Sequence, residues 1–258
     1  MRTAPAGAAE TAESRLRAAI KTNDTWWPTL FSGPVANRLV RVLARRPGIH
    51  PNHVTVASML LALAAAASFA VGTYPALFSG ALLVQGAFVL DCADGQLARY
   101  RGLVSPFGEI LDRIFDRAKP ILYLSTLAWG ADVHGHHEEI WILAFIAAFG
   151  FTLVEVYAQQ FRVLAASAPP VHTDDATLPL PLRALDLPFL RHSGGDHYFL
   201  ISLFCLLDRV KLVLVLLAAT ATIQLVVRPI YYAFVLRHIH GVWPWELGRT
   251  RSNAARRG

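Results

Sequence analysis

Long apolar runs alternate with short polar links through most of this 258-residue chain. Six runs have the length and composition of helices that lie in a hydrophobic environment, and they cover 54–73, 76–99, 108–131, 139–161, 196–208 and 211–236. A helix needs about 20 apolar residues to cross the hydrocarbon core of a bilayer. The pattern therefore predicts an all-α integral membrane protein with six transmembrane helices, of which the fifth is short.

A different pattern precedes the first apolar run. Between Trp26 and Arg46, apolar residues recur every three or four positions with arginines between them. This spacing predicts an amphipathic helix that lies in the membrane interface, although an ordinary solvated helix has the same pattern. We therefore divide the chain into an N-terminal segment with this juxtamembrane helix (1–50), a six-helix membrane domain (51–238) and a basic tail (239–258).

Composition supports the membrane class. Hydrophobic residues make up 54% of the chain and charged residues only 16%, against about 25% charged residues in an average soluble domain. Cys92 and Cys205 both fall in apolar runs, so no disulfide framework is indicated. The N-terminus lacks the apolar core and cleavage site of a signal peptide. Anchoring beside anionic lipid explains the formal charge of +6 more simply than nucleic-acid binding does.

The placement of lysine and arginine predicts the orientation. The N-terminal flank, the links at 99–107 and 162–195 and the C-terminal tail are basic, whereas the links at 73–75 and 131–139 contain no lysine or arginine. By the positive-inside rule, both termini and the link between the second and third spans face the cytoplasm. Only Arg209 and Lys211 oppose this assignment. We expect a multi-pass protein of the cytoplasmic membrane.

Four aspartates interrupt the second and third apolar runs: Asp91, Asp94, Asp112 and Asp116. On a helix, the first two (i, i+3) share a face, and so do the last two (i, i+4). Four neighbouring buried carboxylates would cost many kcal/mol unless something neutralised them. One or two divalent cations are suited to that role because they prefer hard oxygen ligands. The spacing predicts a metal centre inside the membrane; the alternative is a set of structural ion pairs with nearby arginines or Lys119.

The residues around these aspartates form a longer pattern. It reads Asp91-x2-Asp94-Gly95-x2-Ala98-Arg99-x8-Gly108-x3-Asp112-x3-Asp116 and resembles the signature of the CDP-alcohol phosphotransferase (CDP-alcohol phosphatidyltransferase) family, with every fixed position filled. Upstream, Pro51-Asn52-His53-Val54-Thr55 resembles the family's Pro-Asn-x-x-Thr segment. The stretch 21–55 is similar to the subgroup that includes di-inositol-phosphate phosphate synthases and archaeal lipid synthases.

The resemblance implies an activity and a set of site residues. It implies transfer of a substituted phosphoryl group from a CDP-alcohol, such as CDP-diacylglycerol, to an acceptor alcohol, with release of CMP. It also implies that the four aspartates hold Mg²⁺ or Mn²⁺, as two ions, that Asp116 is the general base, and that a homodimer forms. The implied nucleotide contacts are Asn52, Thr55, Asp91, Gly95, Ala98, Arg99 and Gly108. Outside this pattern, Gly95 and Ala98 would indicate close helix packing, and Arg99 the membrane interface.

The contacts with the acceptor are less strongly indicated. Arg117, Lys119 and Arg191 are candidates for a pocket that binds an anionic acceptor; they are equally consistent with snorkelling or with pairing to the aspartates. Further polar residues lie at membrane depth, where function or residence in the interface explains them equally well: Glu155, Gln159, Gln160, Gln224 and Arg228.

Two other classes of membrane protein use intramembrane aspartates. A prenyltransferase that binds Mg²⁺-diphosphate would carry its aspartates on two well-separated segments, whereas these four lie within 26 residues. An ion-coupled transporter would show internal repeats or broken helices, and neither is evident. We therefore favour the phosphotransferase.

Overall fold

The computed structural model describes residues 12–20, 26–135, 138–167 and 194–240, and these residues form helices with short links and no strand. This confirms the all-α prediction. Six helices coincide with the six apolar runs, within a few residues at most ends: α3 (Pro51–Val71), α4 (Tyr74–Arg101), α5 (Pro106–Val133), α6 (Glu139–Ser167), α8 (Gly194–Leu206) and α9 (Val210–His240).

Four of these helices have the length and composition to cross a membrane, namely α3, α4, α6 and α9. The first half of α5 is highly charged because it carries six ionisable residues between Glu109 and Lys119. The 13 residues of α8 extend only about 20 Å, less than the roughly 30 Å of a hydrocarbon core. The described chain is therefore a helical protein with four candidate spans.

The segment predicted as one amphipathic helix has two parts. A π-helical turn, η1 (Pro28–Ser32), leads into α2 (Gly33–Ala44). The N–H of Gly33 donates to the carbonyl of Pro28, five residues back, and Pro34 has no N–H with which to restore the regular pattern. Ala36 and Val40 of α2 are fully buried in a cluster with Leu97 of α4. The interfacial location of this segment stays a prediction.

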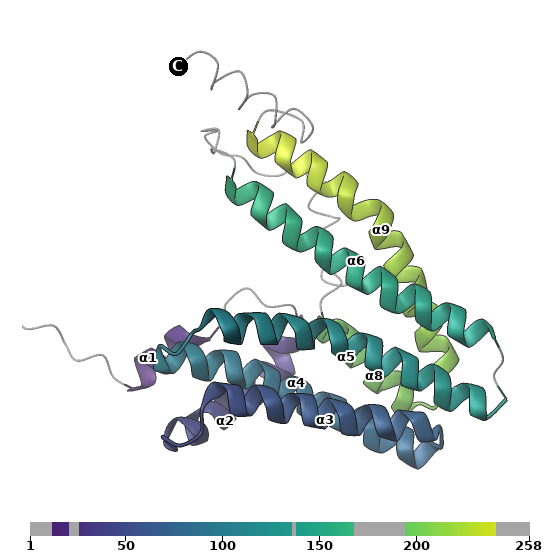
Figure 1. The fold of residues 1–258 in the computed structure, drawn as a ribbon, viewed down its shortest axis with the longest axis horizontal. Coiled ribbons are helices and arrows are strands. Elements are labelled where there is room, and N and C mark those ends of the chain that lie inside the picture. Colours follow the sequence, from purple (N-terminus) through teal and green to yellow (C-terminus); the bar gives the residue numbers. More distant parts are fainter. Residues whose placement is uncertain (1–11, 21–25, 136–137, 168–193, 241–258) are drawn as a thin grey trace, which may run out of the picture.

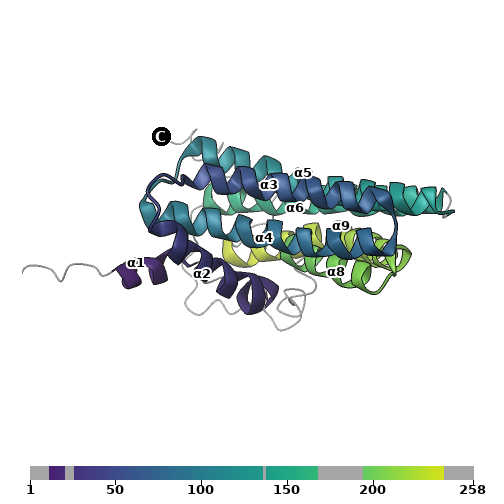
Figure 2. The ribbon, with the colours of Figure 1, turned by 90° about the horizontal axis from the view of Figure 1, so that it is seen from below.

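The long helices are arranged around α3 and α4. The first of these packs against both α4 and α5, whereas α4 also contacts α8 and α2. In Figure 1, α6 and α9 form a pair that diverges from α5 toward the C-terminal ends of both helices, and Figure 2 shows α2 lying against α4. Large buried side chains such as Phe69, Tyr123 and Leu127 fill the core of the bundle.

A short link orients α4 and α5 for the site. The first of these helices ends at Gly102, whose φ of 64° lies in the left-handed region that favours glycine. Ser105 then caps α5 by accepting a hydrogen bond of 3.0 Å from the N–H of Gly108. Arg101 donates to the carbonyls of Leu43 and Arg46 at 2.9 and 2.8 Å, and so holds the end of α4 against the last turn of α2 and the link that follows it.

Candidate active site

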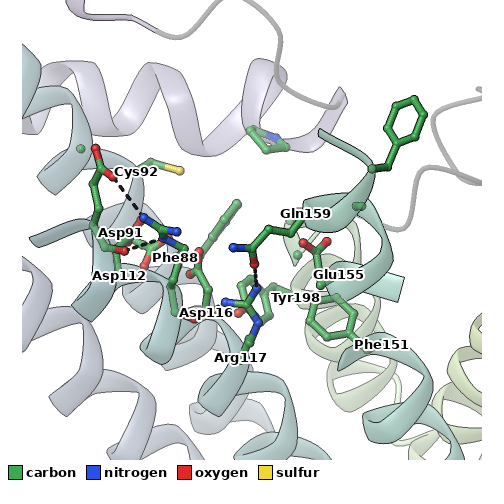
Figure 3. Close-up of a pocket in the computed structure, with 18 of the residues that line it drawn as sticks. Phe88, Asp91, Cys92, Asp112, Asp116, Arg117, Phe151, Glu155, Gln159 and Tyr198 are labelled. Atoms are coloured by element: carbon green, nitrogen blue, oxygen red, sulfur yellow. Dashed lines mark hydrogen bonds and ion pairs between the residues drawn. The ribbon is translucent and has the colours of Figure 1, made fainter. Parts of the chain in front are cut away.

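Three of the four aspartates predicted to bind metal come together. Asp91 on α4 and Asp112 and Asp116 on α5 each place a carboxylate oxygen within 4.8 Å of the other two. In Figure 3 the three residues lie along one side of a pocket. The spacing of four residues on α5 and the link after α4 produce this arrangement, because they turn both helices toward a common space.

Asp94 lies deeper in the same region. Its residue is only 5% exposed, and the side chain of Thr55 lies beside it. Its Oδ2 atom is buried and has no hydrogen-bond partner among the described residues. Buried polar atoms in folded proteins are almost always paired, so this oxygen indicates a ligand that the protein itself does not supply.

The donor set fits a hard divalent cation. All of the donors are carboxylate oxygens, the ligands that Mg²⁺ and Mn²⁺ prefer. Oxygens on opposite sides of one Mg²⁺ lie about 4 Å apart, because each Mg–O bond is about 2.1 Å. The donor oxygens of Asp91, Asp112 and Asp116 all lie within 4.8 Å of one another, which is compatible with that size. The unpaired oxygen of Asp94 supports the same conclusion.

Lys119 of α5 is buried next to Asp91. Its residue is 1% exposed, and its amino group forms an ion pair with Asp91 Oδ1. The side chain is not among those that line the cavity. Of the two interpretations of Lys119, the geometry matches pairing with an aspartate more closely than contact with an acceptor.

The carboxylates open into a cavity of about 1100 Å³. Its walls come from α4, α5, α6 and α9, together with Pro28, Gly33 and the start of α8. Seven of the predicted site residues line it: Asp91, Asp94, Gly95, Arg99, Asp112, Asp116 and Arg117. Five others lie outside the lining: Asn52, Thr55, Ala98, Gly108 and Lys119. Arg191 lies outside the described residues.

Two of these non-lining residues are neighbours. A β-carbon at Gly108 would lie 3.6 Å from Asn52 Oδ1 and 3.1 Å from Ser105 Oγ. The start of α3 therefore lies against the start of α5. Asn52 lies near Gly108 of α5 and Thr55 lies near Asp94 of α4, but neither residue lines the cavity.

Arg99 folds back over the glycine one turn before it. A β-carbon at Gly95 would lie 3.3 Å from Arg99 Nη1. On its other side, Arg99 Nε donates to the carbonyl of Ala19 at 2.8 Å, at the end of α1 (Ala12–Ala19). The guanidinium of Arg99 thus lies between the C-terminal end of α1 and the backbone of α4 at Gly95, which has no side chain.

A polar wall from α6 and α9 faces the carboxylates. In Figure 3, Glu155 and Gln159 of α6 lie across the pocket from Asp116, and Arg117 Nη2 donates to Gln159 Oε1 at 2.6 Å. On α9, Arg228 donates to Gln224 Oε1 at 2.9 Å and to the Tyr232 hydroxyl at 2.7 Å. Arg117 of α5, which contacts this wall, and Arg228 of α9 thus both place guanidinium groups on the lining of the cavity.

Comparison with known proteins identifies the family. The family model described as CDP-alcohol phosphatidyltransferase matches residues 48–226, which is more than half of the chain. The chain belongs to the CDP-alcohol phosphatidyltransferase family. The match includes both sequence motifs and extends from just before α3 into α9, so it confirms the resemblance found in the sequence.

Named relatives within this family cover only parts of the chain. Archaetidylinositol phosphate synthase of Pyrococcus horikoshii is 35% identical over 46% of this chain and 58% of its own length. The bifunctional IPC transferase and DIPP synthase of Aquifex aeolicus is 28% identical over 68% of this chain and 37% of its own length. The chain therefore spans less than two thirds of the length of these curated relatives.

A solved structure shares the fold. The crystal structure of Mycobacterium tuberculosis phosphatidylinositol phosphate synthase with CDP-DAG bound has a TM-score of 0.53 at 21% identity. The similarity covers 78% of this chain and 93% of the other. At this level of identity, the comparison supports the helical architecture alone.

Some lining residues of this family member did not emerge as site residues from the sequence. The aromatic residues Phe88, Phe151, Tyr231 and Tyr232 line the cavity but have no distinguishing pattern in apolar helices. The pairs Glu155 with Gln159 and Gln224 with Arg228 are each four residues apart, so each pair shares a helix face. Polar residues four positions apart in apolar helices are the sequence pattern from which the α6–α9 wall could have been predicted.

Proposed function

We propose that this protein transfers a substituted phosphoryl group from a CDP-alcohol to the hydroxyl of an acceptor alcohol, with release of CMP, in phospholipid or related phosphodiester biosynthesis. The observation that carries the proposal is the carboxylate cluster of Asp91, Asp112 and Asp116 at the wall of a large cavity. Family membership favours this reaction over the prenyltransferase and the transporter that the aspartates alone would permit.

Asp116 is the general base in the proposed reaction. It accepts the proton of the acceptor hydroxyl as that oxygen attacks the β-phosphorus of the donor. A new phosphorus–oxygen bond forms to the acceptor, the anhydride bond to CMP breaks, and CMP carries away the electron pair of that bond. Two Mg²⁺ or Mn²⁺ ions held by Asp91, Asp94, Asp112 and Asp116 would neutralise charge on the diphosphate. Asp116 thus has two roles, because it is both a metal ligand and the base.

The donor and the acceptor approach the carboxylates from different walls. Gly95 allows the Arg99 guanidinium to lie close to the backbone of α4, and this stretch is the proposed contact for the base or the diphosphate of the donor. Ala98, Asn52, Thr55 and Gly108 support this donor side from neighbouring positions. Arg117, on the side of the α6–α9 wall, contacts the acceptor. Arg191, which lies outside the described residues, is proposed from the sequence as a further acceptor contact.

The proposed substrates follow the chemistry named for the relatives. The M. tuberculosis structure has CDP-DAG bound, and the P. horikoshii relative is named for an inositol phosphate product. CDP-diacylglycerol or a related lipid is therefore the first donor to test, and inositol phosphate the first acceptor. The guanidinium groups of Arg117 and Arg228 on the cavity lining suit an acceptor that carries phosphate.

The membrane setting completes the proposal. The six helices of the membrane domain all lie within the bilayer region in this proposal. They are α3, α4, α6 and α9, the charged α5 and the short α8. The segment 26–46 lies in the interface, and the active site and both termini face the cytoplasm. A homodimer is the expected assembly. CDP-activated lipids are then accessible from the bilayer and soluble acceptors from the cytoplasm.

The proposal is tested by measuring CMP release. Purified protein in lipid vesicles is incubated with CDP-diacylglycerol, a panel of acceptors that starts with inositol phosphate, and Mg²⁺ or Mn²⁺. We expect acceptor-dependent release of CMP that EDTA abolishes. Asp116→Asn should lower the rate by about 10²–10⁴-fold, the usual loss for a general base.

Asp132→Asn is the matched control. Asp132 is also an aspartate of α5, but it lies at the other end of the helix, where its Oδ2 accepts a hydrogen bond from Trp141 Nε1. An asparagine can accept the same bond, so activity should be retained. Full activity in Asp116→Asn, or no metal-dependent CMP with any CDP-alcohol and acceptor, would overturn the proposal.

A further inference from the structure

Lys119 is the one lysine or arginine classed as buried among the described side chains. Its ammonium group contacts Asp91, and Asp91 in turn belongs to the cluster with Asp112 and Asp116. A buried lysine without an anionic partner is strongly disfavoured. The contact therefore stabilises Lys119, and Lys119 likewise offsets part of the negative charge of the cluster.

The cations near the four aspartates differ in burial. Lys119 is buried against Asp91, whereas Arg113 and Arg117 line the cavity together with the aspartates and are more exposed than Lys119. Removing one partner of a buried ion pair is strongly destabilising, because the other charge is left uncompensated. A divalent cation bound by the aspartates would supply the same compensation from another source. Lys119 and a bound metal thus have overlapping electrostatic roles at Asp91.

We propose that Lys119 is the resident counter-ion of the metal-free site, and that its positive charge limits the affinity of the aspartates for divalent metal. The inference rests on the proposed function only in that the aspartates bind metal. It assigns Lys119 a positioning role, since the residue acts through Asp91 and does not contact the substrates. The family signature does not include this position, which lies three residues after Asp116.

Thermodynamic linkage makes the inference testable. A ligand that binds only the folded state stabilises it in proportion to its affinity. If Lys119 compensates the aspartates, Lys119→Met should destabilise the metal-free protein far more than the metal-bound protein. The rise in melting temperature on adding metal is then larger in this variant than in the native protein. A side chain that only fills space would lower both melting temperatures equally.

The experiment uses Mn²⁺ as the probe. Native protein, Lys119→Met and the charge-retaining Lys119→Arg are purified with Mg²⁺, treated with EDTA and titrated with Mn²⁺. Bound Mn²⁺ is measured from the loss of the free-ion EPR signal, and the melting temperature is recorded at each concentration. We expect Lys119→Met to bind Mn²⁺ about tenfold more tightly, which corresponds to about 1.4 kcal/mol, and Lys119→Arg to remain near the native affinity.

The results separate this inference from the proposed function. Equal metal-induced shifts in melting temperature, or unchanged or weaker Mn²⁺ binding in Lys119→Met, would overturn the role of Lys119 while native protein still binds the ion. Native protein that binds no Mn²⁺ would instead contradict the metal site itself. If metal-free Lys119→Met does not remain folded, Lys119→Gln, which retains a hydrogen-bond donor for Asp91, undergoes the same titration and the same criteria apply.

Discussion

Gly130 allows α5 to touch the end of α3 at backbone distance. A β-carbon at this position would lie 2.1 Å from the carbonyl oxygen of Phe69 and 2.9 Å from the Cα of Gly72. Both obstructing atoms belong to the backbone, so they cannot move aside by a change of rotamer. Close approach of this kind is the usual role of glycine between membrane helices.

We therefore expect Gly130→Ala to separate the two helices and lower stability. Overpacking typically costs about 1–3 kcal/mol, and backbone obstruction should bring the effect to the upper part of that range. The apparent melting temperature in detergent is the measurement. Gly86→Ala is the control, because a β-carbon there would meet only the end of the Leu61 side chain, at 3.1 Å. Equal losses of stability in the two variants would contradict this account.

The sequence was most informative for residues whose chemistry is unusual in their surroundings. The four aspartates stood out because charge is rare in apolar helices, and their spacing on two helices was enough to predict a shared site. Lys119 was harder to assign. Its neighbours in sequence suggested several roles, and only the packing of α5 beside α4 brings its ammonium group to Asp91. The partner of a long flexible side chain depends on tertiary contacts that spacing does not encode.

The N-terminal helix α1 contacts Arg99, a residue of the cavity lining. Leu16 of α1 is buried in a cluster with Val40 and Leu97, and the carbonyl of Ala19 accepts a bond from Arg99 Nε. Helix C-termini carry partial negative charge, which favours a guanidinium at this place. Docking of α1 therefore fixes the orientation of Arg99 over Gly95.

Undocking α1 should weaken binding of the donor. We expect Leu16→Asp to raise the Kd for CDP by about five- to tenfold, or about 1–1.4 kcal/mol, because Arg99 loses its orientation. The Kd is measured by calorimetry. In an Arg99→Ala background the same change should have no further effect, as a double-mutant cycle requires. Ala18→Asp, on the exposed side of α1, is the control, and equal effects of Leu16→Asp in both backgrounds would contradict the coupling.

Apolar patterning predicted the elements well and their details less well. The six apolar runs form six helices because an apolar stretch in a membrane must pair its own backbone N–H and C=O groups. A helix achieves this within a single segment. The segment from Trp26 to Arg46 is predicted as one amphipathic helix, yet its residues 28–32 form a π-helical turn, and Pro34 lacks an N–H. Two of the six helices are not candidate spans by length and composition. The first half of α5 carries too many charged residues, and α8 is too short.

The cavity is formed by helices from most of the described chain. Its lining combines Pro28 in η1, the aspartates of α4 and α5, and polar residues of α6 and α9. These lining residues lie up to 204 positions apart in the chain, from Pro28 to Tyr232. The divergence of α6 and α9 from α5 in Figure 1 is likewise a property of the assembled bundle. The sequence pattern identified the four aspartates because they lie within 26 residues of one another, whereas the α6–α9 wall became evident only from the fold.

The predicted orientation of the molecule can be tested with two exposed positions at opposite ends of the bundle. Leu103 lies in the link between α4 and α5, beside the basic Arg99 and Arg101, and Val133 lies at the other end of α5. Since cytoplasmic links carry the excess of lysine and arginine, we expect Leu103 to face the cytoplasm and Val133 the opposite side. The carboxylate cluster, which is nearer the Leu103 end of α5, would then be supplied from the cytoplasm.

Cysteine labelling provides the measurement. In a Cys92→Ala, Cys205→Ala background expressed in a bacterial inner membrane, Leu103→Cys and Val133→Cys are exposed to a membrane-impermeant maleimide in intact spheroplasts. Val133→Cys should react directly, whereas Leu103→Cys should react only after the membrane is permeabilised. The reverse pattern would invert the orientation and place the active site where CDP-activated substrates are absent. Labelling of both positions in intact spheroplasts would instead contradict a transmembrane α5, and with it the six-span arrangement.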